Sequence, residues 1–372
     1  MKRLLVYIVN LLALAIALML LISVGAGYLD PRSYGIVAPL VLVSGFVAIV
    51  ALVALVVCLA MRNLKASLTL GVALLISMPT MRLQFPLRLG SKPDNTDRTF
   101  TVLTWNVCIF EDMIGIDEEG TTIKHILEVD ADVVMLQETS SYSGDYLDQP
   151  ETALYRSQVE QRYPYRSSSY RDLVIWSKIP YTVLPDTTMK NNKSMVEGDS
   201  SYHYYGKVFD LTVKGHQLRM IDLHLQSIGL TPDDKQLYRD LASLNKRVKT
   251  EDELREVKHT LWDKISGASQ RRAAEAQCVR AILDNSPGNV IVCGDFNDVA
   301  GSYSYYTVRG DDMHDAFAGA ATHPAYSFNR DQLFFRIDHM LYRGDMRAVS
   351  SRIDKAGSSD HYPIITTFEW NE

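Results

Sequence analysis

Residues 289–298, NVIVCGDFND, join a short apolar run to an acidic turn. The run contains the β-branched residues valine and isoleucine, which predicts a buried strand over residues 289–293. The Gly-Asp-x-Asn sequence that follows favours a turn, so Asp295 and Asn297, each taken alone, fit a simple capping role. Their place after a buried strand is also where α/β folds position ligands and catalytic groups.

Short apolar strands next to polar side chains recur along the chain. The polar residues are Asn106 in TVLTWN, Glu138 in DVVMLQE, His224 in LRMIDLH, Asp338 in RIDHML, and Asp360 with His361 in SSDHYP. Each of them, taken alone, also fits a purely structural role, as a turn former, a solvated strand end or a partly buried histidine. Their repetition at strand ends favours one shared site.

The rest of this region alternates strands with helices. Strands are predicted over residues 100–108, 132–137, 173–177, 204–213, 218–224, 336–342 and 364–369. A helical pattern over residues 121–129 separates the first two strands. Residues 232–283 form a charge-rich, helix-prone stretch whose earlier part is interpreted as an insertion. This alternation predicts an α/β domain.

The candidate residues suit the hydrolysis of a phosphate ester. This reaction needs neutralised phosphoryl oxygens, a positioned water and a route for the proton of that water. Hard oxygen ligands such as Glu138 and Asp360 suit Mg²⁺, the expected cofactor, with Mn²⁺ as the alternative. No Cys/His cluster has the spacing of a structural zinc site. Asp338 can orient His361 as a base or as a charged phosphate clamp.

The motifs TWNV, LQE, DLHL, GDFND, RIDHM and SDHYP, in this order, resemble those of the endonuclease/exonuclease/phosphatase superfamily. That superfamily includes the DNase I-like nucleases, neutral sphingomyelinases and inositol polyphosphate 5-phosphatases. The resemblance covers about residues 100–370. It implies a DNase I-like α/β fold, a four-layer sandwich of two mixed β-sheets flanked by helices, with one metal-assisted site along the sheet edges. It also implies a metal-dependent phosphoric ester hydrolase.

The resemblance further implies a metal-ligand set. Glu138 is similar in position to the main metal ligand, with Asn106 beside it. Asp360 corresponds either to a ligand or to a contact of metal-bound water. Abasic-site repair nucleases carry an acidic residue where Cys108 stands here, which makes repair of abasic DNA a less suitable activity.

Catalytic roles are implied for the remaining motif residues. Asp295 would polarise or deprotonate the attacking water, and Asn297 and His224 would contact the scissile phosphate. Asp338 would orient His361, which either stabilises the phosphoryl oxygens or serves as the base.

Two further segments bear on this resemblance. The stretch RDLVIWSKIP, residues 171–180, has Arg171 and Asp172 where glycine is common in the family. The tyrosine-rich residues 302–317 are similar to a segment of membrane-tethered bacterial members. Their aromatic rings either line a substrate cleft or pack over the sheet edge.

The first eighty residues contain three long apolar runs, at residues 4–24, 36–61 and 66–81. The first two are uncharged, long enough to cross a bilayer and apolar all round, unlike a surface helix with one polar face. The third run is shorter and is expected to close at Pro79 and Arg82. We therefore expect an anchor of about three transmembrane helices over residues 1–82, a polar linker over residues 83–98 and a catalytic domain over residues 99–372.

Basic residues indicate the orientation of the anchor. Lys2 and Arg3 before the first run, and Arg62 and Lys65 after the second, predict cytoplasmic ends by the positive-inside rule. Three spans then place the catalytic domain outside a cytoplasmic (inner) membrane. Basic residues after the third run argue weakly for the opposite side.

Composition narrows the functional classes. The net charge is −6 and no basic tract exceeds two adjacent residues, which disfavours a dedicated duplex-binding protein. The four cysteines are interpreted as small buried residues rather than as a disulfide framework. No ionisable residue lies within the spans to mark an ion path, so they are interpreted as anchors rather than as a transporter.

Two functions follow from the motifs and the anchor. The first is hydrolysis of a phosphate ester, whose substrate would be a lipid head group, an inositol phosphate or a nucleic acid. The alternative is a catalytically silent protein that binds a phosphorylated ligand. The lipid bilayer is the expected partner of the N-terminal helices, and no feature points to an obligate protein partner.

Overall fold

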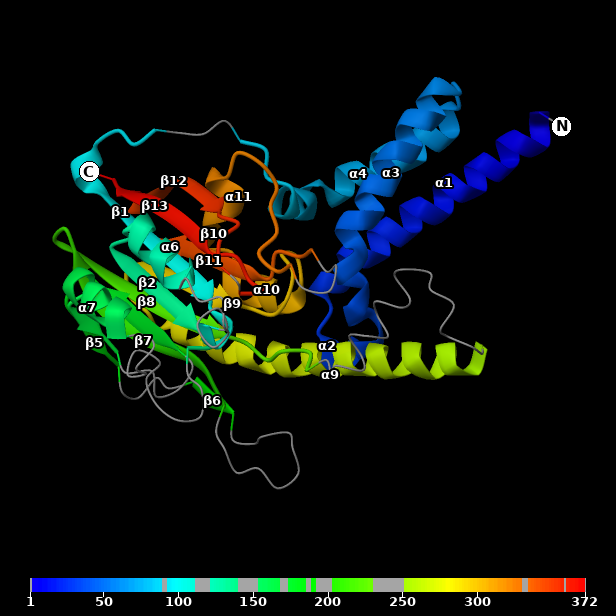
Figure 1. Cartoon of the computed structure of the whole chain (residues 1–372). Coiled ribbons are helices and arrows are strands. Elements are labelled where there is room, and N and C mark those ends of the chain that lie inside the picture. The colour runs from blue at the N-terminus through cyan, green and yellow to red at the C-terminus, as the bar shows by residue number, and fades with distance from the viewer. Residues whose placement is uncertain are drawn as a thin grey trace. The chain divides into compact units, whose positions relative to one another are not determined.

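The structure is a computed structural model that describes residues 2–88, 92–110, 121–139, 153–167, 173–184, 189–191, 203–229, 251–329, 334–357 and 359–371. The chain divides into two compact units (Figure 1). The first contains Met1–Phe85, Ile228–Ala273 and Val299–Tyr306. The second contains Pro86–Ser227, Ala274–Asp298 and Thr307–Glu372.

The first unit contains the apolar N-terminal helices. They are α1 (Lys2–Gly25), α3 (Ser44–Ala60) and α4 (Leu64–Gln84), with the short η1 (Ala26–Tyr28), α2 (Pro31–Tyr34) and η2 (Gly35–Val43) between α1 and α3. The stretches Arg3–Tyr28, Pro31–Ala60 and Leu64–Gln84 are each long and apolar enough to cross a membrane. Small residues such as Ala17, Ala51 and Ala73 are buried where these helices pack together, as is usual for helices in lipid.

The third helix is longer than its sequence predicts. It does not close at Pro79 but continues through it to Gln84. Proline removes one backbone donor, yet an apolar helix packed on its neighbours, as α4 is on α1 and α3, tolerates this loss. The second run is also not one uniform α-helix, because its first part, around Pro39, is the 3₁₀ helix η2.

The tyrosine-rich segment after the acidic turn contributes packing contacts to the first unit. The ring of Tyr306 stacks on that of Tyr28 at a centroid distance of 4.5 Å, and its hydroxyl lies 2.8 Å from Oγ1 of Thr80. Tyr305 is fully buried. Tyr306 therefore packs, but on Tyr28 and Thr80 rather than over the sheet edge.

The second unit is built on two β-sheets. The first sheet has the order β12-β13-β1-β2-β4-β3. Its strands are β1 (Thr99–Asn106), β2 (Val133–Gln137), β3 (Tyr165–Arg166), β4 (Val174–Ser177), β12 (Met346–Ile353) and β13 (Ile364–Trp370). β1 is parallel to β2 and antiparallel to β13, so the sheet is mixed.

The second sheet has the order β10-β11-β9-β8-β7-β5, and β6 also pairs with β7. Its strands are β5 (Tyr181–Val183), β6 (Met189–Asn191), β7 (His203–Val213), β8 (His216–His224), β9 (Asn289–Asp295), β10 (His314–Asp315) and β11 (Asp338–Arg343). β8 and β9 are parallel, whereas β11 is antiparallel to β9, so this sheet is mixed as well.

Apolar side chains from the two sheets meet in one buried core. Val133 and Met135 of β2 share this core with Met220 of β8 and Ile291 of β9. Their i, i+2 spacing on β2 follows from the alternation of strand side chains between the two faces.

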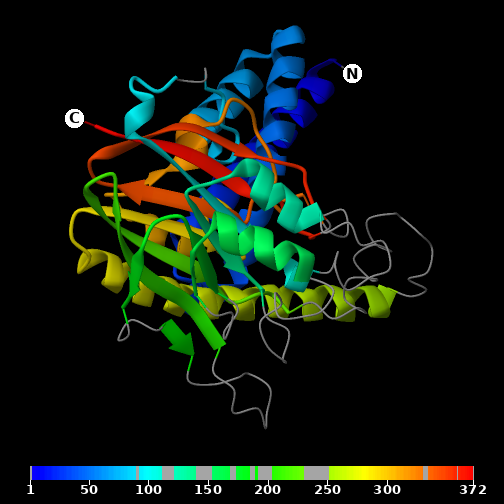
Figure 2. The ribbon, with the colours of Figure 1, turned by 60° about the vertical axis from the view of Figure 1, so that its left-hand side comes forward.

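Helices cover the outer faces of the sheets (Figures 1 and 2). Residues of α6 (Thr121–Val129) and α7 (Ala153–Arg162), including Ile126 and Val159, pack with Trp105 and Trp176 of the first sheet. The C-terminal part of α9 (Glu251–Asp284) lies along the second sheet, where Arg343 donates to the Leu283 carbonyl at 2.7 Å. The predicted four-layer α/β sandwich is thus confirmed.

Smaller elements complete the unit. They are η3 (Thr96–Arg98), η4 (Cys108–Phe110), α10 (Tyr303–Arg309) and α11 (Ala316–Ala320). The edge strand β12 was not predicted, because its apolar residues are interrupted by arginines and serines. Of the predicted insertion, residues 232–250 lie outside the described residues.

The cysteine prediction needs one correction. Cys58, Cys108 and Cys293 are buried, but Cys278 on α9 is exposed, because a helical pattern alone does not tell which of its small residues face the core.

Candidate active site

The strand directions bring the predicted residues to one edge of the second unit. The parallel pairs β1–β2 and β8–β9 end there, at Asn106, just before Glu138, and at His224 and Asp295. The antiparallel strand β11 begins at the same edge, because Asp338 is the register partner of Asp295. Side chains from strands far apart in the sequence therefore converge.

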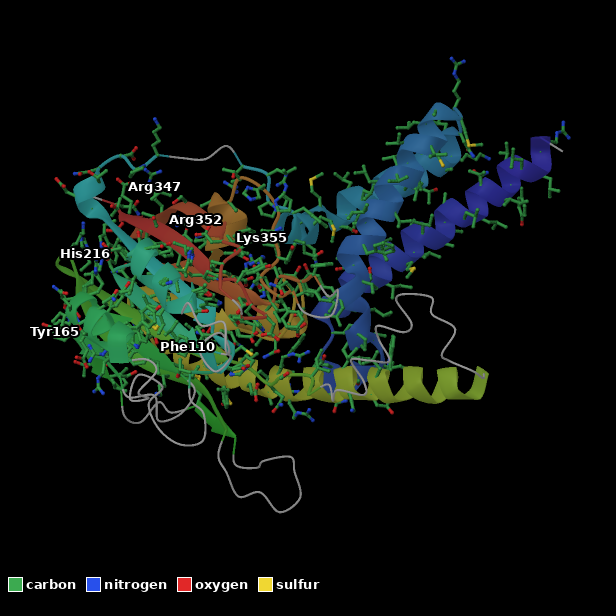
Figure 3. All side chains as sticks on the ribbon, viewed as in Figure 1. Phe110, Tyr165, His216, Arg347, Arg352 and Lys355 are labelled. Carbon is green, nitrogen blue, oxygen red and sulfur yellow. The ribbon has the colours of Figure 1, made fainter. Side chains whose placement is uncertain are left out.

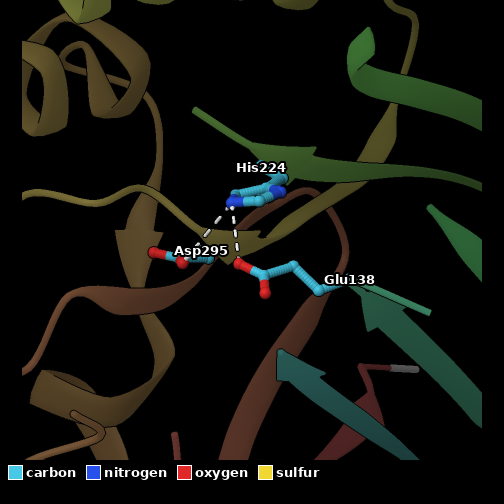
Figure 4. A group of neighbouring side chains, drawn as sticks. All are labelled: Glu138, His224 and Asp295. Carbon is cyan, nitrogen blue, oxygen red and sulfur yellow. Dashed lines mark ion pairs between the residues drawn. The ribbon is translucent and has the colours of Figure 1, made fainter. Parts of the chain in front are cut away.

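Glu138, His224 and Asp295 form the first cluster (Figure 4). His224 Nε2 lies 3.5 Å from Glu138 Oε1 and 3.9 Å from Asp295 Oδ2. Asn106 Nδ2 donates to Glu138 Oε1 at 2.9 Å and to Asp295 Oδ2 at 3.1 Å. The Glu138 side chain is 35% exposed, whereas that of Asp295 is 1% exposed. Glu138 is thus the member of this cluster that solvent reaches.

Asp295 also belongs to a second cluster, with Asp338 and His361. His361 Nδ1 donates to Asp338 Oδ2 at 2.8 Å, and its Nε2 lies 3.7 Å from Asp295 Oδ2. The imidazole is therefore held between two buried carboxyl groups. Asp295, shared by both clusters, is the centre of the site.

A strained turn presents Asn297. Its φ is +51° and that of Glu138 is +53°, a left-handed conformation that is unfavourable for residues with a side chain and that clusters at functional sites. Two hydrogen bonds from Asn297 to Asp295 offset the cost of this backbone conformation. The Asn297 backbone N–H donates to Oδ1 at 2.7 Å, and Nδ2 donates to Oδ2 at 3.2 Å. Nδ2 also donates to the Leu225 carbonyl at 2.9 Å.

Asp360 is close to the site but outside both clusters. It is partly exposed, and its backbone carbonyl accepts from the Asn329 N–H at 3.0 Å. Its role as a metal ligand stays a prediction. Ser359, which the sequence did not single out, accepts from the His361 N–H at 3.1 Å and donates to the Asn106 carbonyl at 2.7 Å. Ser359 therefore links the backbone at His361 to the backbone at Asn106.

Burial and neighbouring charge shift the pKa values of the central pair. Burial raises the pKa of Asp295, the charge of His361 opposes this, and the result is about 6. Burial lowers the pKa of His361, but Asp338 and Asp295 more than offset this and raise it to about 10. The imidazolium form of His361 is thus stabilised by its two carboxylate neighbours.

A buried polar layer lies beneath the site. Asp222, two residues before His224, accepts from Gln137 Nε2 at 2.6 Å, and the same Nε2 donates to Thr104 at 3.1 Å. Burial raises the pKa of Asp222 well above its usual range. Sequence patterns missed this layer, because a polar residue inside an apolar strand gives no sign of a partner on another sheet.

The donor atoms fit a hard divalent cation. Carboxylate oxygens of Glu138 and Asp295 lie close to one ring nitrogen of His224, and oxygen donors of this kind suit Mg²⁺ or Mn²⁺. The described residues contain no sulfur donor in either cluster. Cys108 is buried, and its backbone N–H donates to the side-chain Oδ1 of Asn106 at 3.1 Å. Arg171 and Asp172 lie outside the described residues.

The two packed mixed sheets, with a carboxylate and histidine site at their edge, define the class of the protein. Residues 103–361 match the model of the Endonuclease/Exonuclease/phosphatase family. Because this match covers more than half of the chain, the protein belongs to that family. A comparison with curated proteins finds none that matches the sequence.

Several solved structures are similar to the chain. An endonuclease/exonuclease/phosphatase from Beutenbergia cavernae is 16% identical, with a TM-score of 0.48, over 74% of this chain and 72% of its own. The human Nocturnin catalytic domain with bound sulfate is 15% identical, with a TM-score of 0.45, over 78% and 98%. Danio rerio TDP2 in complex with a single-strand DNA product is 15% identical, with a TM-score of 0.45, over 73% and 99%.

Proposed function

We propose that this protein is a membrane-anchored, divalent-metal-dependent phosphoesterase. The observation that carries the proposal is the convergence of Glu138, His224, Asp295, Asp338 and His361 from both sheets onto one edge. Membership of the Endonuclease/Exonuclease/phosphatase family supports hydrolysis of phosphate esters in general.

Glu138, with Asn106 beside it, would hold the cation, because its carboxylate is the solvent-reachable oxygen donor of the first cluster. When bound, a divalent cation neutralises negative charge on the phosphate group. Asp360 would be a further ligand of the same cation or a contact of its water.

Asp295 would orient the attacking water and accept its proton. Its side chain is 1% exposed and meets His361 on one side and His224 on the other. Two hydrogen bonds from Asn297 hold the carboxylate in place. A fixed, desolvated carboxylate next to the reacting phosphate is suited to general base catalysis.

His361 would stabilise a phosphoryl oxygen rather than accept a proton. Asp338 accepts from its Nδ1, and Asp295 faces its Nε2, an environment that favours the charged ring. A charged donor preorganised beside the phosphate stabilises the charge that develops in the transition state. His224 and Asn297 would donate to the remaining phosphoryl oxygens.

The proposed membrane anchor narrows the range of expected substrates. Tethering by three apolar helices favours lipid head groups or nucleic acid outside the cytoplasm over chromosomal DNA, with inositol phosphates as a further class. Both arginines of β12, labelled in Figure 3, have acidic partners: Arg347 pairs with Glu369 at 2.6 Å and Arg352 with Asp354 at 3.0 Å. Because duplex binding depends on unpaired basic groups, we place lipid head groups first.

The test uses the full-length protein in detergent micelles, stripped of metal and then supplied with Mg²⁺ or Mn²⁺. It is given a generic phosphodiester, bis-p-nitrophenyl phosphate, and then phospholipids, inositol phosphates and DNA. Glu138→Ala is compared with Glu128→Ala, which removes an exposed carboxylate on α6 outside the site. We expect metal-dependent hydrolysis that Glu138→Ala lowers at least about 100-fold and Glu128→Ala leaves unchanged.

Three results would contradict parts of this proposal. Absence of hydrolysis in the wild-type protein on every substrate would favour the silent, ligand-binding alternative. Hydrolysis that survives Glu138→Ala would remove Glu138 from the metal site. Hydrolysis of DNA alone would overturn the lipid assignment while leaving the chemistry intact.

A further inference from the structure

His339 is a fully buried histidine that the proposed mechanism does not use. It follows Asp338 on β11, but its side chain points to the other face of the sheet and away from His361. Both ring nitrogens make polar contacts: Nδ1 lies 2.8 Å from Nη1 of Arg336, and Nε2 lies 2.8 Å from the carbonyl oxygen of Asp298. Phe296 packs edge-on against the ring at 5.0 Å.

These two contacts define the tautomer of His339. A guanidinium group only donates hydrogen bonds, so Nδ1 must accept from Arg336. A carbonyl oxygen only accepts, so Nε2 must carry the proton and donate to Asp298. Burial, and next the charge of Arg336, lower the pKa of His339 to about 3, which agrees with a neutral ring. His339 is therefore a fixed donor to the Asp298 carbonyl.

Arg336 is itself held in place. Its Nη2 donates to Asp315 Oδ2 at 2.9 Å, and the guanidinium lies 5.1 Å from the ring centre of Phe317. Asp315 Oδ1 in turn accepts from the Ala318 N–H and caps α11. The side chains of Arg336 and Asp315 are 5% and 1% exposed. A rigid chain of contacts thus runs from α11 to the Asp298 carbonyl.

The Asp298 carbonyl closes the strained turn of the site. Asn297, which precedes it, has a φ of +51° and must hold that conformation for its N–H and side chain to reach Asp295. The Phe296 N–H is fixed by the Ile337 carbonyl at 3.0 Å. The turn is thus tied to β11 on both sides of Asn297.

We propose that His339 is a positioning residue, whose Nε2–H holds the Asp298 carbonyl and thereby keeps Asn297 against Asp295. The inference deepens the proposed function and rests on it for its catalytic consequence. The placement of the turn itself can be measured without any activity.

A matched pair of substitutions separates the two contacts of the ring. In His339→Gln the longer side chain places an amide near the former Nε2 and keeps a donor to Asp298. In His339→Asn the shorter amide lies near the former Nδ1 and keeps only the Arg336 contact. His323→Asn, at an exposed histidine, controls for the loss of a histidine.

Hydrogen exchange by mass spectrometry on the full-length protein reports on the turn. We expect the peptide that covers residues 296–299 to exchange faster in His339→Asn and at the wild-type rate in His339→Gln and His323→Asn. Equal exchange in the Asn and Gln variants would overturn the inference, whether or not the protein hydrolyses any substrate.

Steady-state kinetics then test whether His339 affects catalysis by positioning Asn297. We expect His339→Asn to lower kcat about 10- to 100-fold, with KM within about threefold of wild type. In an Asn297→Ala background, His339→Asn should lower kcat by less than about threefold, because the side chain that His339 positions is then absent. Fully additive losses would show that His339 acts by another route. If the wild-type protein has no turnover, the proposed function fails, and the exchange result alone decides the role of His339.

Discussion

At the scale of single residues, the contact between Asp338 and His361 is the feature most open to a direct test. Asp338 Oδ2 accepts from His361 Nδ1 at 2.8 Å, and both side chains are almost completely buried. The carboxylate orients the ring and supplies the negative charge that stabilises its protonated form.

We predict that Asp338→Asn lowers kcat by about 100- to 10,000-fold, because the isosteric amide keeps the shape but loses the charge. Steady-state kinetics with the best substrate of the panel measures this loss. Asp354→Asn is the matched control, since Asp354 also faces a histidine, His125, at 3.4 Å but outside the site. Equal losses in the two variants would contradict a special role for Asp338.

The neutral state of His339 leads to a prediction on acid stability. Its pKa is about 3 in the folded protein, below the ordinary value of 6.5. Between these two pH values the unfolded chain binds a proton that the folded chain does not, so stability is lost as the pH falls below about 6.5. This loss amounts to at most about 1.4 kcal/mol per pH unit.

His339→Gln removes that titration. We therefore expect the Tm difference between the wild-type protein and His339→Gln to shrink as the pH falls from 7 to 5. Thermal unfolding of both full-length proteins in the same detergent measures it. A Tm difference that stays constant across this range would show that His339 is charged in the folded state or is not buried.

At the scale of elements, the parallel pair β8–β9 positions the centre of the site. Gly294 precedes Asp295 on β9, with a φ of +131°, and a Cβ added there would lie 2.0 Å from the Leu223 backbone oxygen. Only glycine fits this conformation and this close approach. The register of β8 and β9 sets His224 opposite Asp295, so the same glycine governs both stability and site geometry.

We predict that Gly294→Ala destabilises the protein by roughly 2–3 kcal/mol or more, from backbone strain and overlap with Leu223. This corresponds to a lower Tm by about 5 °C or more. Gly319→Ala on α11 is the control, because a Cβ there meets nothing within 4 Å. An unchanged Tm in Gly294→Ala would mean that β9 can shift without cost.

At the scale of the whole molecule, the three apolar helices and the basic residues next to them predict a topology. Three helices are long and apolar enough to span; three spans would place the two chain ends on opposite sides of the membrane, and Lys2 and Arg3 favour a cytoplasmic N-terminus. The catalytic domain would then lie on the extracytoplasmic side of an inner membrane.

Reporter fusions in bacterial cells test this topology. An alkaline phosphatase fused after Asn371 should be active, because it folds only outside the cytoplasm, whereas a fluorescent protein that folds only in the cytoplasm should be dark at the same position. The reverse pattern would show that one of the three helices does not span. A fusion after Met61, at the end of the second span, should give the opposite pattern and serves as the internal control.

Local sequence patterns predicted most of the longer strands, the apolar N-terminal helices and the candidate residues of the site. Apolar runs that end in polar side chains are local features, so the positions of Glu138, His224 and Asp295 near strand ends and the start of β9 at Asn289 could be predicted from neighbouring residues alone. β9 itself continues to Asp295, two residues past its predicted end. The extent of α4 beyond Pro79 could not, because packing on other helices decides whether proline ends a helix.

Which side chains meet depends on the tertiary structure. The contact of Gln137 with Asp222, and that of His339 with Asp298, join segments 85 and 41 residues apart. Such contacts depend on sheet order and strand register, which place residues that are distant in sequence within hydrogen-bond range. The chemistry of the residues is thus local, whereas their burial, their tautomers and their pKa values come from the packing of the two sheets.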